Sequence, residues 1–293
     1  MEKRRLVMDL SDRSAIITGA NQGLGKAIAT EFVRAGAGVL LTARNEEMLR
    51  EVQRELKAVA RPGRAVEILR ADVAKGEDCA ATVRRAVEVL PDLCVLVNNA
   101  GVYGPKGAIE DVDWEEWIRA IEINLFGLVR MCREIIPVLR RKGYGKIVNL
   151  SGGGATNPLP RISAYAASKA AVVRMTDTLA EELKEARVDV NAIAPGALNT
   201  RLLDEVIEAG PEKVGKAFYE RSLKQQKEGG APMEKGAKLA VWLASKESDG
   251  VSGRLISALW DDWESLGKRR EELGRSDIYT LRRIVPEDRG MKW

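Results

Sequence analysis

A short apolar segment that leads directly into a glycine-rich turn and a helix constrains this chain more than any other feature. Residues 14–18 have the composition of a buried strand, the turn carries Gly19, Gly23 and Gly25, and residues 26–35 favour a helix. Glycines let the backbone turn tightly and approach a pyrophosphate, whose charge then meets the N–H groups at the helix start. A glycine triplet also occurs in plain turns, but its position between the first strand and the first helix predicts a nucleotide site.

The alternation of strand and helix continues along the chain. Apolar runs at residues 38–42, 66–70, 93–97, 145–151 and 188–193 are predicted strands, with helical segments between most of them. The run at 93–97 is continuously apolar, which is typical of a strand covered on both faces. Strands that alternate with helices predict an α/β fold with a parallel sheet. No repeat or linker divides the chain.

Composition excludes several classes of function. The 293 residues contain no histidine, which excludes imidazole bases, hydrolase triads and histidine-ligated metal sites. Basic residues number 47 and acidic residues 43, so no nucleic-acid partner is expected. The three cysteines, Cys79, Cys94 and Cys132, are unclustered, which indicates reduced thiols in a cytoplasmic protein without a metal site. No apolar run reaches the ~18 residues of a membrane span, so no membrane partner is expected.

Tyr165 and Lys169 stand four residues apart in a predicted helix and therefore share one face. An ammonium beside a phenol favours the phenolate and is expected to lower the pKa of Tyr165. A phenol shifted in this way becomes a better general acid or base at neutral pH. The same spacing also occurs by chance on solvated helices, so this pair needs support from the rest of the chain.

Three further residues have two interpretations each. Arg44 follows the second predicted strand, where a basic side chain would hold the phosphate of NADP, or it is a solvated loop cation. Asp72 follows the third strand and would contact adenine, or it would cap the helix that begins near Gly76. Asn124 lies among apolar residues in the helical region opened by Asp113, and a structural role satisfying backbone groups is the alternative to a role in catalysis.

These motifs all follow predicted strands. Asn98-Asn-Ala-Gly101, Ser151 and Pro195-Gly-Ala-Leu-Asn-Thr200 come directly after strands, as the glycine turn does. Ligands of open α/β sheets bind outside the carboxyl ends of the strands. The motifs are therefore expected to meet at one edge of the sheet.

The four motifs at 18–25, 98–101, 165–169 and 195–200, in this order, resemble the short-chain dehydrogenase/reductase family over about residues 11–257. The resemblance implies a single Rossmann-type domain over 1–293, with a doubly wound parallel β-sheet of about seven strands flanked by helices on both faces. It also implies hydride transfer through a nicotinamide and a homodimer or homotetramer.

The resemblance assigns a role to each matching position. Tyr165 corresponds to the general acid/base, Lys169 to the residue that binds the nicotinamide ribose and lowers the phenol's pKa, and Asn124 to the holder of a water that links Lys169 to solvent. Thr200 would orient the carboxamide, and Ala43 stands at the acidic NAD position. The cofactor-binding set is Gly19, Asn21, Gln22, Gly23, Leu24, Gly25, Arg44, Asp72, Val73, Asn98, Ala100, Gly101, Tyr165, Lys169, Pro195, Gly196 and Thr200.

One position departs from the family. The substrate-binding serine usually lies thirteen residues before the tyrosine, and that position here is Gly152. Ser151 is one residue early, and three consecutive glycines would let the backbone bring its hydroxyl into place. Ser163 is the alternative hydroxyl, although it would otherwise cap the helix of Tyr165. Ser151 is taken as the catalytic hydroxyl.

Two segments shape the rest of the expected site. Residues 201–230 occupy the position of the family's mobile lid, and their basic residues would meet an anionic substrate or only solvent. Residues 258–293 extend beyond many relatives and include Trp260 and Trp263. This extension is expected to be a subunit contact, a wall of the substrate pocket or a frayed end.

The sequence therefore predicts an NADPH-dependent carbonyl reductase that interconverts a ketone and a secondary alcohol, with NADP(H) favoured over NAD(H). The partner is a small-molecule carbonyl or alcohol substrate. Two alternatives are an NAD-dependent dehydrogenase of a sugar or polyol and a cofactor-binding protein with weak chemistry.

Overall fold

The computed structural model describes residues 8–292; residues 1–7 and 293 of the predicted domain, Trp293 of the extension among them, lie outside the described part. Seven parallel strands form one sheet in the order β3-β2-β1-β4-β5-β6-β7. The predicted fold class, a doubly wound sheet with helices on both faces, is confirmed. The strands are β1 (Ser14–Thr18), β2 (Gly38–Ala43), β3 (Val66–Arg70), β4 (Leu93–Asn98), β5 (Gly145–Leu150), β6 (Val188–Ala194) and β7 (Arg254–Ser257).

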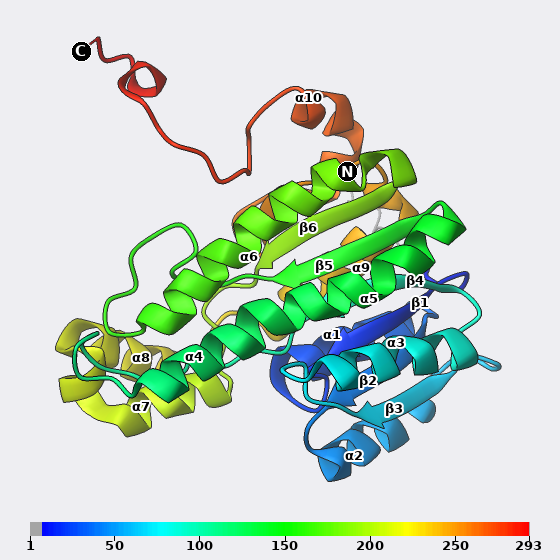
Figure 1. Cartoon of the computed structure of the whole chain (residues 1–293), viewed down its shortest axis with the longest axis horizontal. Coiled ribbons are helices and arrows are strands. Elements are labelled where there is room, and N and C mark those ends of the chain that lie inside the picture. The colour runs from blue at the N-terminus through cyan, green and yellow to red at the C-terminus, as the bar shows by residue number, and fades with distance from the viewer. Residues whose placement is uncertain (1–7, 293) are drawn as a thin grey trace.

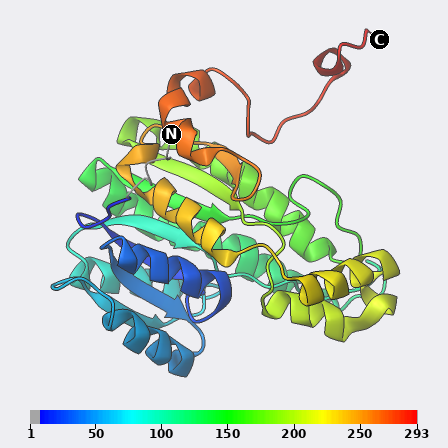
Figure 2. The same ribbon diagram turned by 180° about the vertical axis from the view of Figure 1, so that it is seen from behind.

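Helices cover both faces of the sheet. One layer shows in the view of Figure 1 and the other in Figure 2, which is turned to the opposite side. The layer around α1 contains α1 (Gly23–Arg34), α2 (Glu46–Lys57) and α9 (Met233–Ala244); the other contains α3 (Gly76–Val89), α4 (Trp114–Ile121), α5 (Gly127–Lys142) and α6 (Ser163–Glu182). The lid is formed by α7 (Arg201–Val214) and α8 (Lys216–Glu228), which project beyond the sheet.

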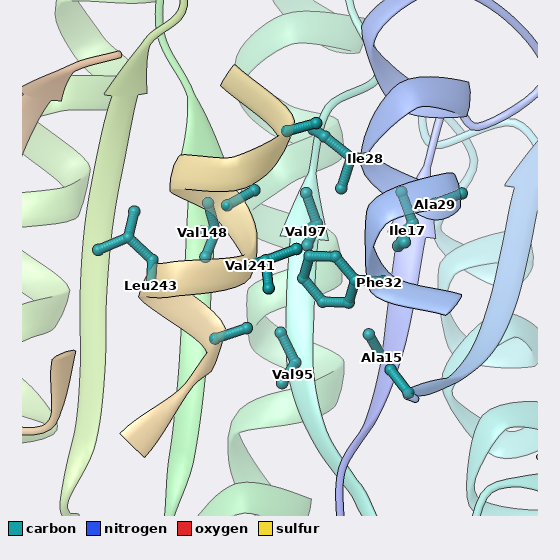
Figure 3. Close-up of a cluster of buried hydrophobic side chains, with 14 of the residues drawn as sticks. Ala15, Ile17, Ile28, Ala29, Phe32, Val95, Val97, Val148, Val241 and Leu243 are labelled. Atoms are coloured by element: carbon teal, nitrogen blue, oxygen red, sulfur yellow. The ribbon is translucent and has the colours of Figure 1, made fainter. Parts of the chain in front are cut away.

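The core lies on both faces of the sheet, against its central strands. All residues of β1, β4 and β5 are buried, as expected for parallel strands with helices on both faces. Figure 3 shows Phe32 of α1 and Val241 of α9 beside Val95 and Val97 of β4. Phe32 is fully buried in this cluster.

Several predicted boundaries differ from the structure at helix ends. The first helix begins at Gly23 and not at residue 26, so Gly25 of the turn already belongs to the helix. The helix of Tyr165 ends at Glu182 and does not reach Arg187, because a 3-10 turn (Lys184–Ala186) and a left-handed residue, Arg187, follow it. Asp113 does open a helix, since its side chain accepts a hydrogen bond from Glu116 N at 2.7 Å.

The first part of the extension is integral to the body and is not frayed. Arg254 of β7 donates to the backbone carbonyls of Ser276 (3.0 Å) and Ile278 (2.8 Å), and Leu255 N donates to Tyr279 O at 2.8 Å. These bonds cover the outer edge of β7, the last strand of the sheet. The end of the extension leaves the body as an arm (Figure 1). Within the described residues, no helix is long and apolar enough to cross a bilayer.

We expect Phe32→Ala to lower the free energy of unfolding by about 3–5 kcal/mol, because it leaves a cavity between α1, α9 and the sheet. Urea denaturation measures the change. The control is Phe126→Ala, at a side chain that is 47% exposed, where a change within about 0.5 kcal/mol is expected. Equal losses in the two variants would contradict this description of the core.

Candidate active site

A cleft of about 1180 Å³ opens at the carboxyl ends of the strands. Pockets for small ligands usually occupy about 300–1,000 Å³, so the cleft has room for a dinucleotide together with a substrate. Most of the predicted site residues line it, as the convergence of motifs at strand ends led us to expect. They are Gly19, Asn21, Gln22, Gly23, Leu24, Gly25, Arg44, Asp72, Val73, Ala100, Gly101, Ser151, Tyr165, Lys169, Pro195, Gly196 and Thr200.

The glycine turn fits a pyrophosphate. Gly19 has φ +64°, in the left-handed region, and a Cβ on Gly25 would lie 2.2 Å from the carbonyl oxygen of Gly19. Helix α1 begins at Gly23, and Gln22 at its N-cap makes no capping bond with its side chain. The N–H groups of the first turn therefore lack a side-chain cap where the helix meets the cleft. Glycines and a helix N-terminus are what the phosphates of a dinucleotide need.

A pair of side chains holds this turn against β4. The carboxamide of Asn99 donates to Thr18 O (2.9 Å) and Gly19 O (3.1 Å). The hydroxyl of Thr18 accepts from the backbone N–H groups of Asn99 (3.0 Å) and Ala100 (3.1 Å). Asn99 lines the cleft but was not predicted as a site residue, although it lies inside the motif at 98–101.

Contact of Asn98 with the adenosine side of the cofactor stays a prediction, but its side chain is turned away from the cleft. Its side chain lies under the cleft and donates to Asn149 Oδ1 of β5 at 2.9 Å. Successive residues of an extended segment point to opposite sides, so Asn98 and Asn99 cannot both face the cleft. Of the two side chains, the one that faces the cleft is that of Asn99.

Tyr165 and Lys169 lie together on α6, and both are buried. Lys169 Nζ donates to Leu150 O at 2.6 Å and lies 5.6 Å from the centre of the Tyr165 ring. Burial lowers the pKa of Lys169 to about 8. Burial also raises the pKa of Tyr165, and the neighbouring Tyr103 raises it further. The expected lowering of the pKa of Tyr165 is therefore wrong, because burial disfavours the charged phenolate.

The departure at Gly152 has a steric reason. A Cβ at this position would lie 2.2 Å from the hydroxyl oxygen of Tyr165. The Tyr165 hydroxyl therefore occupies the space that a serine side chain at position 152 would need. The neighbouring Ser151 lines the same cleft, is 3% exposed, and has no hydrogen-bond partner for its Oγ among the described residues.

Ser163, the alternative hydroxyl, is engaged elsewhere. Its Oγ accepts a hydrogen bond from Trp117 Nε1 at 3.0 Å, and Ser163 is not among the residues that line the cleft. It also does not cap α6, because Ile162 occupies the N-cap position. Both interpretations of Ser163 are therefore wrong, and Ser151 is the serine at the cleft beside Tyr165.

Asn124 lies behind the cleft, in a π-helix (Glu122–Phe126) between α4 and α5. Its Oδ1 accepts from Val102 N (2.8 Å), and its Nδ2 donates to Val102 O (2.8 Å) and Ser168 Oγ (3.0 Å). The structural interpretation of this side chain is thus confirmed, since it satisfies both backbone groups of Val102. The water link to Lys169 stays a prediction.

Asp72 lines the cleft but is not a helix cap. Its carboxylate pairs with Arg119 at 2.7 Å and accepts a bond from Ala74 N at 3.0 Å, while Lys75 is the N-cap of α3. Contact with adenine stays a prediction for this residue. At the same end of the cleft, Arg44 is exposed, and no ion pair of its guanidinium is found within residues 8–292.

Comparison with known proteins decides the family. The model of the short chain dehydrogenase family matches residues 13–210. The chain belongs to the short-chain dehydrogenase family. It is therefore an NAD(P)-dependent oxidoreductase that acts on CH–OH groups, as the four motifs predicted.

Relatives of this dehydrogenase include a 3beta-hydroxysteroid dehydrogenase 1 of Eggerthella lenta, 38% identical over 85% of this chain and 92% of that protein. A solved 7 alpha-hydroxysteroid dehydrogenase with NADH and 7-oxo glycochenodeoxycholic acid is 30% identical, with TM-score 0.75 over 85% of this chain and 94% of that one. A gluconate 5-dehydrogenase from Burkholderia cenocepacia with NADP and tartrate is 25% identical, with TM-score 0.74 over 85% and 94%.

The dehydrogenase also has an apolar group of cleft residues that motif reasoning missed. Tyr103 contacts Tyr165 edge to face, with ring centres 4.6 Å apart. Leu159, Val206 and Phe218 join the same cluster and line the cleft. Two of them come from the lid, so no local signal could have placed them beside Tyr165.

Three of the six basic residues of the lid pair with lid carboxylates. Arg201 pairs with Glu205 at 2.5 Å, and Lys106 from the loop after β4 also pairs with Glu205, at 3.2 Å. Lys216 and Lys224 have partners on α8. This pairing favours ordinary surface charge over a site for an anionic substrate.

The pKa of Lys169 predicts a pH dependence of stability. Because the pKa is lower in the folded chain (about 8) than its ordinary value of 10.5, the unfolded chain binds this proton more tightly. We expect the stability of the wild type relative to Lys169→Met to increase from pH 7 to about 9.5. Urea denaturation of both proteins at several pH values measures the difference. A difference that is constant or decreases with pH would contradict the assignment.

Proposed function

We propose that this dehydrogenase is an NADPH-dependent carbonyl reductase that converts a ketone to a secondary alcohol. The bound nicotinamide would supply the hydride to the carbonyl carbon. The observation that carries the proposal is the buried hydroxyl of Ser151, which lies in the cleft and has no hydrogen-bond partner within residues 8–292. The next residue is Gly152, and the Tyr165 hydroxyl lies against its backbone. A buried donor without a partner is costly, and a substrate oxygen would satisfy it.

The residues beside the carbonyl have separate tasks. Ser151 donates a hydrogen bond to the carbonyl oxygen and keeps it in place. Tyr165 gives its proton to the same oxygen, and its raised pKa keeps the phenol protonated at neutral pH. Lys169, whose Nζ donates to Leu150 O, would bind the nicotinamide ribose.

The preference for NADP(H) rests on the exposed end of the cleft. Arg44 lines the cleft without an ion-pair partner in the described part of the chain, and Ala43 stands at the family's acidic NAD position. A free guanidinium binds a phosphate through charge-assisted hydrogen bonds. The two solved relatives, one with NADH and one with NADP, leave both cofactors within the family's range.

The substrate in this proposal is a small-molecule ketone or secondary alcohol. The hydroxysteroid dehydrogenase among the relatives supports a substrate that carries a hydroxyl or keto group. The proposal includes a homodimer or homotetramer in the cytoplasm. Three unpaired, buried cysteines suit a reducing compartment.

We expect Ser151→Ala to lower kcat for ketone reduction roughly 10²–10³-fold, the loss typical of one oxyanion donor. Binding of NADPH should not change, so the loss separates chemistry from cofactor binding. The measurement is the rate of NADPH oxidation with 2-decalone. Ser163→Ala is the control and should keep its rate, because this hydroxyl faces Trp117. An unaffected rate in Ser151→Ala would contradict its role.

We expect NADPH to bind more tightly than NADH, and Arg44→Ala to weaken NADPH binding roughly tenfold to a hundredfold, as for a charged hydrogen bond. Quenching of tryptophan fluorescence measures both affinities. Arg54→Ala, at an exposed arginine of α2 outside the cleft, is the matched control. Tighter binding of NADH would contradict the proposal and favour an NAD-dependent dehydrogenase of a sugar or polyol.

A further inference from the structure

The extension places an aromatic side chain with little cover at the cleft. Trp260 lines the cleft although it is 85% exposed, the highest value among the exposed large apolar residues described. Its neighbour Trp263 behaves differently, since it packs on buried Trp242 with ring centres 5.9 Å apart. An apolar ring left open to water beside a binding cleft gains contact area when a ligand covers it.

Trp260 is held by a defined turn. Ser257 N donates to Asp261 Oδ2 at 2.6 Å, and Ser257 Oγ accepts from the N–H groups of Leu259 and Trp260, both at 3.3 Å. Leu259 packs against Gly196, where a Cβ would lie 2.4 Å from Leu259 Cδ1. The turn therefore holds the backbone of Trp260 against the loop after β6. The indole is carried by a fixed backbone position at the cleft.

The part of the cleft wall around Tyr165 is largely apolar. Tyr103, Leu159, Val206 and Phe218 surround Tyr165. Two polar lid residues at the cleft are already paired: Ser222 donates to Phe218 O at 2.9 Å, and Gln225 donates to Asn199 at 3.1 Å. Beside this cluster a polyol would lose hydrogen bonds to water, whereas an apolar ligand would not.

We propose that Trp260 determines substrate specificity by stacking on the distal part of a large apolar ketone whose carbonyl reaches Ser151 and Tyr165. This inference rests on the proposed function of the same cleft. It names the substrate class, a ketone with an extended apolar skeleton. One end of such a substrate lies in the wall around Tyr165 and the other against the indole of the extension.

A series of ring ketones tests the proposal. Cyclohexanone, 2-decalone and 5α-androstan-3-one present a ring carbonyl on one, two and four rings, and each is assayed with NADPH. In Trp260→Ala we expect KM for 5α-androstan-3-one to increase roughly fivefold to tenfold, the loss expected for one aromatic contact. KM for cyclohexanone should stay within about twofold, because a single ring leaves the indole uncovered.

Two controls and a binding measurement complete the design. Trp260→Phe keeps an aromatic ring and should retain most of the affinity, while Trp114→Ala removes a tryptophan that is 60% exposed on α4, outside the cleft. Calorimetry measures binding of each ketone with and without NADP⁺. It therefore reports on Trp260 even in a protein that reduces none of the three.

The outcomes separate the two proposals. If the affinity for the ketones increases with the number of rings and Trp260→Ala reduces this increase, the role of Trp260 is supported. If such binding occurs without turnover, only the reductase function is contradicted. Turnover of all three ketones that Trp260→Ala leaves unchanged contradicts only the role of Trp260. An equal change for all three ketones, or no binding of 5α-androstan-3-one, would overturn the inference.

Discussion

The close contact between the turn after β1 and the loop after β4 is the constraint on which the rest of the site depends. A Cβ on Gly19 would lie 2.9 Å from Ala100 Cα, so the two segments meet only because Gly19 has no side chain. The Asn99 carboxamide then bonds the carbonyls of Thr18 and Gly19 across this contact. Neighbouring strands β1 and β4 thereby place the first turn of α1 at the cleft, where parallel strand ends meet.

Burial governs the chemistry at the other end of the cleft. It raises the pKa of Tyr165 and lowers that of Lys169, so each group moves toward its neutral form. Lys169 Nζ donates to Leu150 O, and burial of the charged ammonium costs stability below its folded pKa. The protein therefore gives up stability to keep an ammonium beside a protonated phenol. This is the usual relation between an active site and the fold that holds it.

The extension combines a structural and a functional role. Through Arg254 and Leu255 its backbone covers the open edge of β7, and an uncovered edge strand would pair with other chains. The same segment holds Trp260 at the cleft through the turn at Ser257. Of the expectations for this segment, a wall of the pocket agrees with the position of Trp260, and a contact between subunits stays a prediction.

The sequence by itself determined the order of strands and helices and the residues at the ends of the strands. It predicted β3 to the residue, because apolar runs and turn glycines act locally. Tertiary structure decided which of Asn98 and Asn99 faces the cleft, since Asn149 of β5 takes the side chain of Asn98. It also decided the direction of the pKa shift of Tyr165, and it brought Phe218 and Trp260 to the cleft. The physical reason is that burial and pairing depend on segments far apart in the chain, whereas periodicity and turns depend on neighbours.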